Sequence, residues 1–149
     1  MIYAWTDETT HIWLNAAGTS LFIVDAGSQA LAVGIAHIFN VNAIRKVNIF
    51  ITHFHLDHIL ALSGLIHRSL DAAKILNLYV HEENALELTG WLAENMAHIM
   101  YSDVLKVNVI LLTNDITDVD GVRVQAIIHH KFANNKIRHF ITSTTYAFF

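Results

Sequence analysis

The sequence predicts a single α+β domain in which helices pack outside mixed β-sheet, and two observations lead to that prediction. First, short apolar runs typical of buried strands alternate with stretches in which apolar residues recur at helical spacing. Second, the elements follow one another as strands, helix, strand, helix, strand, helix and strands, an order typical of sheet covered by helices. With 149 residues and no linker or repeat, the chain, residues 1–149, is expected to form one domain.

The N-terminal third is predicted to contain three strands and a helix. Residues 1–5 and 11–15 are expected to form strands on either side of a polar turn. The segment from Ser20 to Asp25 contains a continuous apolar run of four residues, as in a buried strand, and Gly27 permits a sharp turn directly after it. Ser28 is then a suitable N-cap for a helix that ends before Asn40.

The middle of the chain is predicted to continue with alternating strands and helices. Residues 47–52 form a second buried strand, and helical apolar spacing returns after Asp57. Residues 75–80 are expected to form another strand. The stretch from Glu83 to about Met100 has the pattern of an amphipathic helix.

The last third is predicted to consist of strands alone. They are expected at residues 104–112, 122–129, 137–143 and 146–149, with a turn at 118–121. The chain ends on Ala147-Phe148-Phe149, without a polar tail. An apolar strand at the end of a chain leaves an exposed edge that favours association, so we expect the domain to be incomplete at its C-terminus.

The composition narrows the class of protein. A formal net charge of −4, with nine scattered Lys and Arg, gives no basic patch of the kind that marks nucleic-acid binding. The absence of Cys excludes disulfides and thiolate metal ligands, and it is compatible with the cytoplasm. No apolar stretch is long enough to span a membrane, and the N-terminus lacks the pattern of a signal peptide. The sequence therefore predicts a cytoplasmic protein with no membrane partner.

A cluster of histidines follows the second buried strand. His53 and His55 are separated by one residue, so their side chains point the same way in extended backbone and can bind one cation. Asp57 and His58 lie at the turn into the next helix, where they can face a second cation. Imidazole and carboxylate ligands suit zinc, and also manganese or iron. We therefore predict a site for one or two metal ions that activates water for hydrolysis.

Two segments in this region resemble a known family. The run from Asn48 to His58 resembles the HxHxDH signature of the metallo-β-lactamase superfamily, and Phe22–Gly27 resembles that family's strand ending in Asp-x-Gly. Residues 60–65 are similar to the Gly-Leu-Pro-Gly-Leu stretch of the ribonuclease Z and phosphodiesterase branch, from which they depart at Ala61 and Ser63. The resemblance covers most of the chain and implies an αββα sandwich with metal ions at one edge of the sheets.

The resemblance also implies roles for individual residues. His53 and His55 would bind a first metal ion, and Asp57 and His58 a second. Asp25, at the end of the Asp-x-Gly strand, is expected to hydrogen-bond a ligand histidine and fix its tautomer. The family's third ligand of the first ion follows a strand, where this chain offers His129 and His130; we favour His130 slightly because it lies further into the expected loop.

Two of the family's ligands have no counterpart in this sequence. They are a later Asp that bridges both metal ions and a final His, and both would follow strands that the chain barely reaches before Phe149. A single site of His53, His55 and His130 remains open, with Asp57 as general base or orienting group. His81, after a strand end, could line the substrate cleft.

The predicted function is metal-dependent hydrolysis of a phosphodiester or an ester. The substrate would be a small phosphodiester or RNA, although no basic arm for transfer RNA is present. A non-catalytic fragment or engineered fold that retains the motif is the alternative, supported by the missing ligands and the absence of Pro. In a third interpretation, a homo-oligomer forms in which a second copy completes the core or the site.

Overall fold

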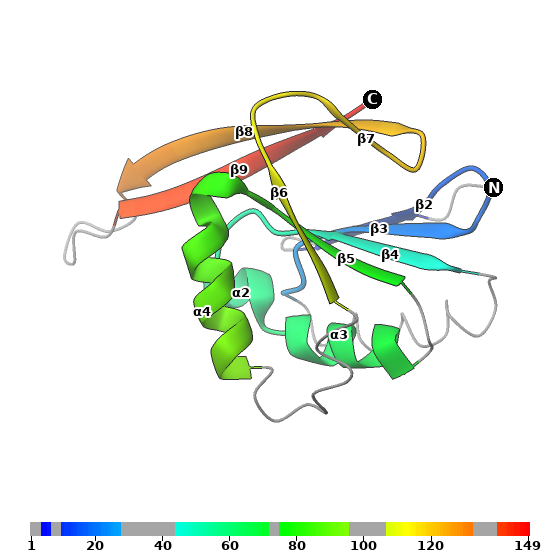
Figure 1. The fold of residues 1–149 in the computed structure, drawn as a ribbon, viewed down its shortest axis with the longest axis horizontal. Coiled ribbons are helices and arrows are strands. Elements are labelled where there is room, and N and C mark those ends of the chain that lie inside the picture. The colour runs from blue at the N-terminus through cyan, green and yellow to red at the C-terminus, as the bar shows by residue number, and fades with distance from the viewer. Residues whose placement is uncertain (1–3, 7–9, 28–43, 72–74, 96–106, 133–139) are drawn as a thin grey trace.

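The computed structural model describes residues 4–6, 10–27, 44–71, 75–95, 107–132 and 140–149, which form two β-sheets with helices on one side (Figure 1). The strands, in chain order, are β1 (Ala4–Thr6), β2 (His11–Leu14), β3 (Ser20–Val24), β4 (Lys46–Phe50), β5 (Ile75–His81), β6 (Val107–Leu112), β7 (Thr117–Val119), β8 (Val122–Phe132) and β9 (Phe140–Phe148). The helices are α2 (Leu56–Ile59), α3 (Leu62–Asp71), α4 (Ala85–Asn95) and the 3-10 turn η1 (Glu82–Asn84).

The larger sheet has six strands in the order β1-β2-β3-β4-β5-β6. Strands β1, β2 and β3 pair antiparallel, whereas β3, β4, β5 and β6 pair parallel. The smaller sheet is antiparallel in the order β7-β8-β9. Because four neighbouring strands of the larger sheet run parallel, their carboxyl ends meet at one edge, where ligand sites of such sheets usually lie.

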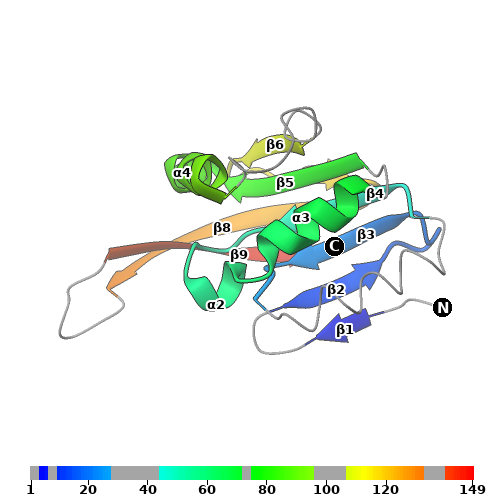
Figure 2. The ribbon, with the colours of Figure 1, turned by 90° about the horizontal axis from the view of Figure 1, so that it is seen from below.

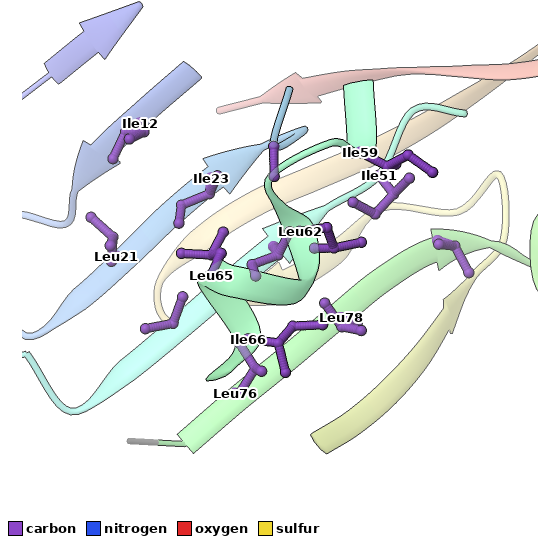
Figure 3. Close-up of a cluster of buried hydrophobic side chains, with 14 of the residues drawn as sticks. Ile12, Leu21, Ile23, Ile51, Ile59, Leu62, Leu65, Ile66, Leu76 and Leu78 are labelled. Carbon is purple, nitrogen blue, oxygen red and sulfur yellow. The ribbon is translucent and has the colours of Figure 1, made fainter. Parts of the chain in front are cut away.

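One face of the larger sheet is covered by α3, which packs over the middle strands (Figures 2 and 3). Every second residue of β4 faces this side, so Val47 and Ile49 are fully buried against the helix. The helix contributes Leu62, Leu65 and Ile66, which are also fully buried. This aliphatic cluster packs α3 against the larger sheet.

The opposite face of the larger sheet packs against the smaller sheet through aromatic side chains. Phe50 lies at the centre of this second cluster, with its ring centroid 4.5 Å from that of Tyr79 and 5.3 Å from that of Tyr146. The hydroxyl of Tyr146 in β9 donates to the backbone oxygen of Ile51 at 2.7 Å. Both contacts attach β9 to the segment that carries the histidine cluster.

The layers of helices, larger sheet and smaller sheet confirm the predicted α+β class. Each strand expected from the sequence in the described residues is present, but the last two are one strand, because β9 runs without a break from Phe140 to Phe148. The predicted four-residue turn is only Asp120-Gly121, both with positive φ, as in a tight hairpin. The helix predicted after Ser28 lies outside the described residues.

Within the described part of the chain, no helix is both long and apolar enough to cross a membrane.

Candidate metal centre

The histidine cluster lies where the parallel strands end. Strand β4 stops at Phe50, and residues 51–55 form the connection to α2, whose short helix contains Asp57 and His58 (Figure 1). Asp25 follows β3 in the same way, on the neighbouring strand. From the other sheet, the backbone N–H of Thr144 in β9 donates to the oxygen of Thr52 at 2.9 Å. The cluster is therefore built between the end of the larger sheet and β9.

Three histidine rings gather in this connection and in the α2 helix that follows it. The centroids of His53 and His58 are 4.2 Å apart, and those of His53 and His55 are 4.7 Å apart. All three residues are partly exposed. The structure thus brings together three of the predicted ligands from one short segment of chain, with His53 between the other two.

Asp25 connects this segment to the sheet. It is almost fully buried, with 4% of its surface exposed, and has a φ of 60°. One carboxylate oxygen accepts from the backbone N–H of Thr52 at 2.8 Å. The other accepts from the Thr52 hydroxyl at 2.6 Å and contacts His58 Nδ1 at 2.7 Å. The contact with a motif histidine that the sequence predicted for Asp25 is therefore present.

The position of His53 is set by the same hydrogen-bond network. Its Nδ1 lies 2.9 Å from the Thr52 hydroxyl oxygen. Because that hydroxyl donates its proton to Asp25, its oxygen is available to accept from His53 Nδ1–H. Thr52, which the sequence analysis did not single out, thus links Asp25 to one ring while Asp25 holds another.

The imidazole rings of His53 and His58 lie in different electrostatic environments. Burial, with the neighbouring His58, holds the pKa of His53 below its usual value of 6.5. The hydrogen bond to Asp25 raises the pKa of His58 above that value, although burial opposes it. Metal binding requires neutral imidazole, so a cation would compete with the proton on His58 more than with a proton on His53.

Asp57 lies at the exposed end of the cluster. Its side chain is 67% exposed, and one carboxylate oxygen is 3.6 Å from His58 Nε2. The predicted partners Asp57 and His58 therefore lie together at the surface of α2.

The structure separates the two remaining candidates, His129 and His130. The sequence predicts a strand that ends at His129, with His130 in the following loop. Instead β8 continues to Phe132, because its pairing with β9 includes both histidines, opposite Ser143 and Thr142. Successive residues of a strand point to opposite faces.

His130 lies on the β8 face that also carries the buried Val124 and Ala126, which points toward the larger sheet. Its Nε2 is 3.0 Å from the carboxylate of Glu83 in η1. His129 is exposed on the opposite face, with its Nε2 3.1 Å from the Thr145 hydroxyl. Of the two, only His130 lies on the side that faces the larger sheet.

His81 does not line an open cleft. It is buried at the end of β5, where Nδ1 accepts from the backbone N–H of Glu83 at 3.2 Å and Nε2 therefore donates to Asn114 Oδ1 at 2.9 Å. This histidine caps η1 and fixes the start of α4. Its role is structural, since both ring nitrogens bind the protein.

The donor set fits a divalent cation, although the side chains are not arranged as a finished site. Imidazole and carboxylate are the ligands that zinc prefers, and three rings already lie within one connection. Among the described residues, however, no three His, Asp or Glu side chains converge as a metal-binding group.

Comparison with known proteins identifies the family of the chain. The family model for the metallo-beta-lactamase superfamily matches residues 5–133, which is most of the chain. The chain belongs to the metallo-β-lactamase superfamily. Members of this superfamily typically bind divalent metal ions such as zinc. Nothing in the match distinguishes the ribonuclease Z branch.

Solved structures of the same fold are similar over most of this superfamily member. The crystal structure of a diphosphatase of the PhnP family has a TM-score of 0.59 and 15% identity, covering 92% of this chain and 47% of that one. The metallo-beta-lactamase fold protein YhfI from Bacillus subtilis has a TM-score of 0.56 and 15% identity, covering 91% and 49%. A beta-lactamase domain protein from Burkholderia ambifaria has a TM-score of 0.50 and 18% identity, covering 87% and 46%.

These likenesses establish the fold and no more, because the identities are low. The chain spans about half the length of the solved structures that it matches. A comparison with curated protein sequences gives no match.

Proposed function

We propose that this superfamily member carries the metal centre of a metal-dependent hydrolase. His53, His55 and His130 would hold a first ion, and Asp57 and His58 a second. The observation that carries the proposal is the gathering of three histidine rings, at centroid separations of 4.2 and 4.7 Å, on a connection that Asp25 and Thr52 hold in place. Of the paired alternatives His129 and His130, the orientation of β8 favours His130.

The residues of the site would have two kinds of role, metal binding and proton transfer. A bound zinc ion, or manganese or iron in its place, would lower the pKa of a water molecule and polarise the bond to be broken. If one ion binds, at His53, His55 and His130, Asp57 would accept or orient the proton of that water, since it is exposed beside His58. Asp25 has no route to the substrate, since it is buried beneath the cluster, and its part is to hold His58 and Thr52.

The proposed substrate is a small phosphodiester, with a carboxylic ester as the wider class. A diphosphatase among the structural neighbours supports phosphoryl chemistry. The low content of Lys and Arg favours a small substrate over RNA. The ribonuclease Z-like assignment, carried by Leu56 and residues 62–65, and a cytoplasmic location, compatible with the absence of Cys, belong to the same proposal.

Turnover of bis(p-nitrophenyl) phosphate, measured with added zinc or manganese, tests the proposal. We expect a measurable rate that His55→Ala reduces by at least about 100-fold, since a lost ligand removes the metal. His67→Ala is the matched control, because His67 is an exposed histidine of α3 outside the cluster. A rate that is unchanged by His55→Ala would exclude this site as its source.

A second candidate is a non-catalytic fold, or one that is active only when a second copy completes it. The lack of a finished three-ligand group among the described residues favours it. Light scattering combined with the same turnover assay distinguishes the two. A rate per chain that rises with protein concentration, together with a dimer mass, would support completion by a second copy.

A further inference from the structure

The contact between Glu83 and His130 joins the two sheets next to the candidate metal centre. Strand β8 pairs His130 with Thr142 and Ile128 with Thr144, and Thr144 binds the backbone of Thr52. His130 therefore lies two residues, about 7 Å, along β8 from the point at which β9 meets the motif segment. Glu83 reaches it from the end of β5, with 3.0 Å between Oε2 and Nε2.

We propose that Glu83 is a positioning residue that orients His130 for metal binding. The inference rests on the proposed function, in which His130 is the third ligand of the first ion. A ligand histidine commonly donates its other ring N–H to a carboxylate, which fixes both tautomer and ring direction. Glu83 supplies such a carboxylate from η1, which follows β5 of the larger sheet, so it acts through His130 and touches neither metal nor substrate.

The hydrogen bond assigns the tautomer of the ring. A carboxylate only accepts, so Nε2 of His130 carries the proton that it donates to Glu83. In neutral imidazole the lone pair then resides on Nδ1, which becomes the metal-binding nitrogen. The hydroxyl oxygen of Thr142 lies 3.5 Å from Nδ1, at the limit of hydrogen bonding, so this contact is easily given up.

The residues on either side of Glu83 in the chain, His81 and Asn84, fix the position of its backbone. Its backbone N–H donates to the buried His81, and the next residue, Asn84, is 1% exposed. The Nδ2 of Asn84 donates to the backbone oxygen of Thr142, the residue opposite His130, at 3.1 Å. Since Nδ2 also contacts the carboxylate of Glu87, an acceptor, the amide has one consistent orientation. These contacts fix the backbone of Glu83 beside His130, and the carboxylate reaches Nε2 at 3.0 Å from there.

Stability alone does not account for this contact. The side chains of His130 and Glu83 are 43% and 45% exposed, and ion pairs in such positions contribute little to folding. A positioning role predicts a different result, in which removal of the carboxylate weakens metal binding while the fold is nearly unaffected.

The test compares Glu83→Ala and Glu83→Gln with Glu82→Ala, in which the neighbouring exposed carboxylate of η1 is removed. Zinc affinity is measured by competition with a chromophoric chelator, and the His130 tautomer by long-range proton–nitrogen NMR of the metal-free protein. We expect Glu83→Ala to weaken binding about 10- to 100-fold. Glu83→Gln, whose amide oxygen can still accept, should recover much of that affinity, and Glu82→Ala should match the wild type.

Three results would overturn the inference. One is an affinity unchanged by Glu83→Ala, and another is an equal loss in Glu82→Ala, which would indicate a general effect of charge. The third is a fall in melting temperature of more than about 5 °C that accompanies the loss, which would indicate a structural role. If the wild type binds no zinc, the proposed function fails. The tautomer then decides the positioning claim, with Nε2–H in the wild type and a mixture in Glu83→Ala expected.

Discussion

Asp25 is the residue that holds the histidine segment of this metallo-β-lactamase-superfamily chain in place. Its buried carboxylate accepts from the backbone and the hydroxyl of Thr52 and contacts His58 Nδ1. Its φ of 60° lies in the left-handed region, which Asp and Asn tolerate better than most residues. The backbone conformation and the carboxylate are therefore both needed at this position.

We expect Asp25→Ala to lower the free energy of unfolding by about 3 kcal/mol, because it leaves buried donors without a partner and places Ala at positive φ. Asp25→Asn should lose less, since Asn tolerates this φ and can still accept from Thr52. Urea denaturation of the metal-free protein measures both. Asp57→Asn, at an exposed carboxylate, is the control and should change little. Equal stability of Asp25→Ala and wild type would show that the hydrogen bonds to Asp25 contribute nothing to folding.

The sequence predicts some of these residues and not others, for physical reasons. His53, His55, Asp57 and His58 follow one buried apolar run within six residues, so their spacing was sufficient to group them, and Asp25 ends a second such run. The contact between Glu83 and His130 depends on how the two sheets pack. No local pattern indicates that packing, which is why Glu83 was missed.

At the scale of elements, the hairpin between β7 and β8 ties the smaller sheet to the larger one. In its turn, the carboxylate of Asp120 accepts from Lys46 at 2.7 Å and from Asn48 at 3.0 Å, both in β4. Asn48 continues a ladder of side-chain amides across the parallel strands, because it accepts from Asn77, which in turn accepts from Asn108. Asp120 ends this ladder.

Protonation of Asp120 makes the stability of the fold depend on pH in the acid range. Burial raises its pKa, but hydrogen bonds from Lys46, Asn48 and Ser20 outweigh that effect and hold the pKa below the usual 3.8. A depressed folded-state pKa means that this carboxylate stabilises the fold above its unfolded-state value. The contribution is lost as the pH falls from that value through the folded-state pKa.

We therefore expect Asp120→Asn to reduce stability by about 1 kcal/mol at pH 7, a modest effect because Lys46 is partly exposed. The variant should also flatten the loss of stability below about pH 4, where protonation of Asp120 no longer contributes. Thermal unfolding between pH 2 and pH 7, compared with Asp115→Asn at an exposed position, measures the difference. Parallel profiles for wild type and Asp120→Asn would contradict the assignment.

Element boundaries were less predictable than element types. The sequence places a break before Tyr146, yet β9 continues through Thr144 and Thr145 because both are paired with β8. In the same way β8 extends past His129, since hydrogen bonds to β9 stabilise polar residues in extended backbone. Long-range pairing overrides local polarity in both strands.

At the scale of the whole molecule, the two sheets are joined by an aromatic cluster centred on Phe50. Its ring stacks on Tyr79 at 4.5 Å and meets Phe148 of β9 edge-on at 5.2 Å. Phe50 is fully buried and ends the strand that leads to the histidine segment. A change at this position should affect both the packing of the sheets and the shape of the site.

We expect Phe50→Ala to reduce the free energy of unfolding by about 3–5 kcal/mol, the usual cost of removing a buried aromatic ring. Leu86→Ala, at a side chain that is 87% exposed, should change it by less than about 0.5 kcal/mol. Guanidinium denaturation followed by tryptophan fluorescence measures both. A loss of less than about 1 kcal/mol for Phe50→Ala would show that this cluster does not join the sheets.

The overall fold was the most predictable feature, because alternating apolar patterns specify strands and helices and their order specifies the layers. The backbone hydrogen bond from Thr144 of β9 to Thr52 was not predictable, since it depends on the register of the hairpin with β8. The fold aligns over about half of the length of the solved structures that it resembles.

Metal content per chain, measured by elemental mass spectrometry, tests the central claim most directly. The wild type and the variant His53→Ala/His55→Ala are purified, reconstituted with zinc, manganese or iron, and freed of unbound ions. We predict one or two ions per chain in the wild type and none in the variant, with both chains folded. A folded wild type that retains no ion after reconstitution would contradict the account and leave the histidine cluster without a metal-binding role.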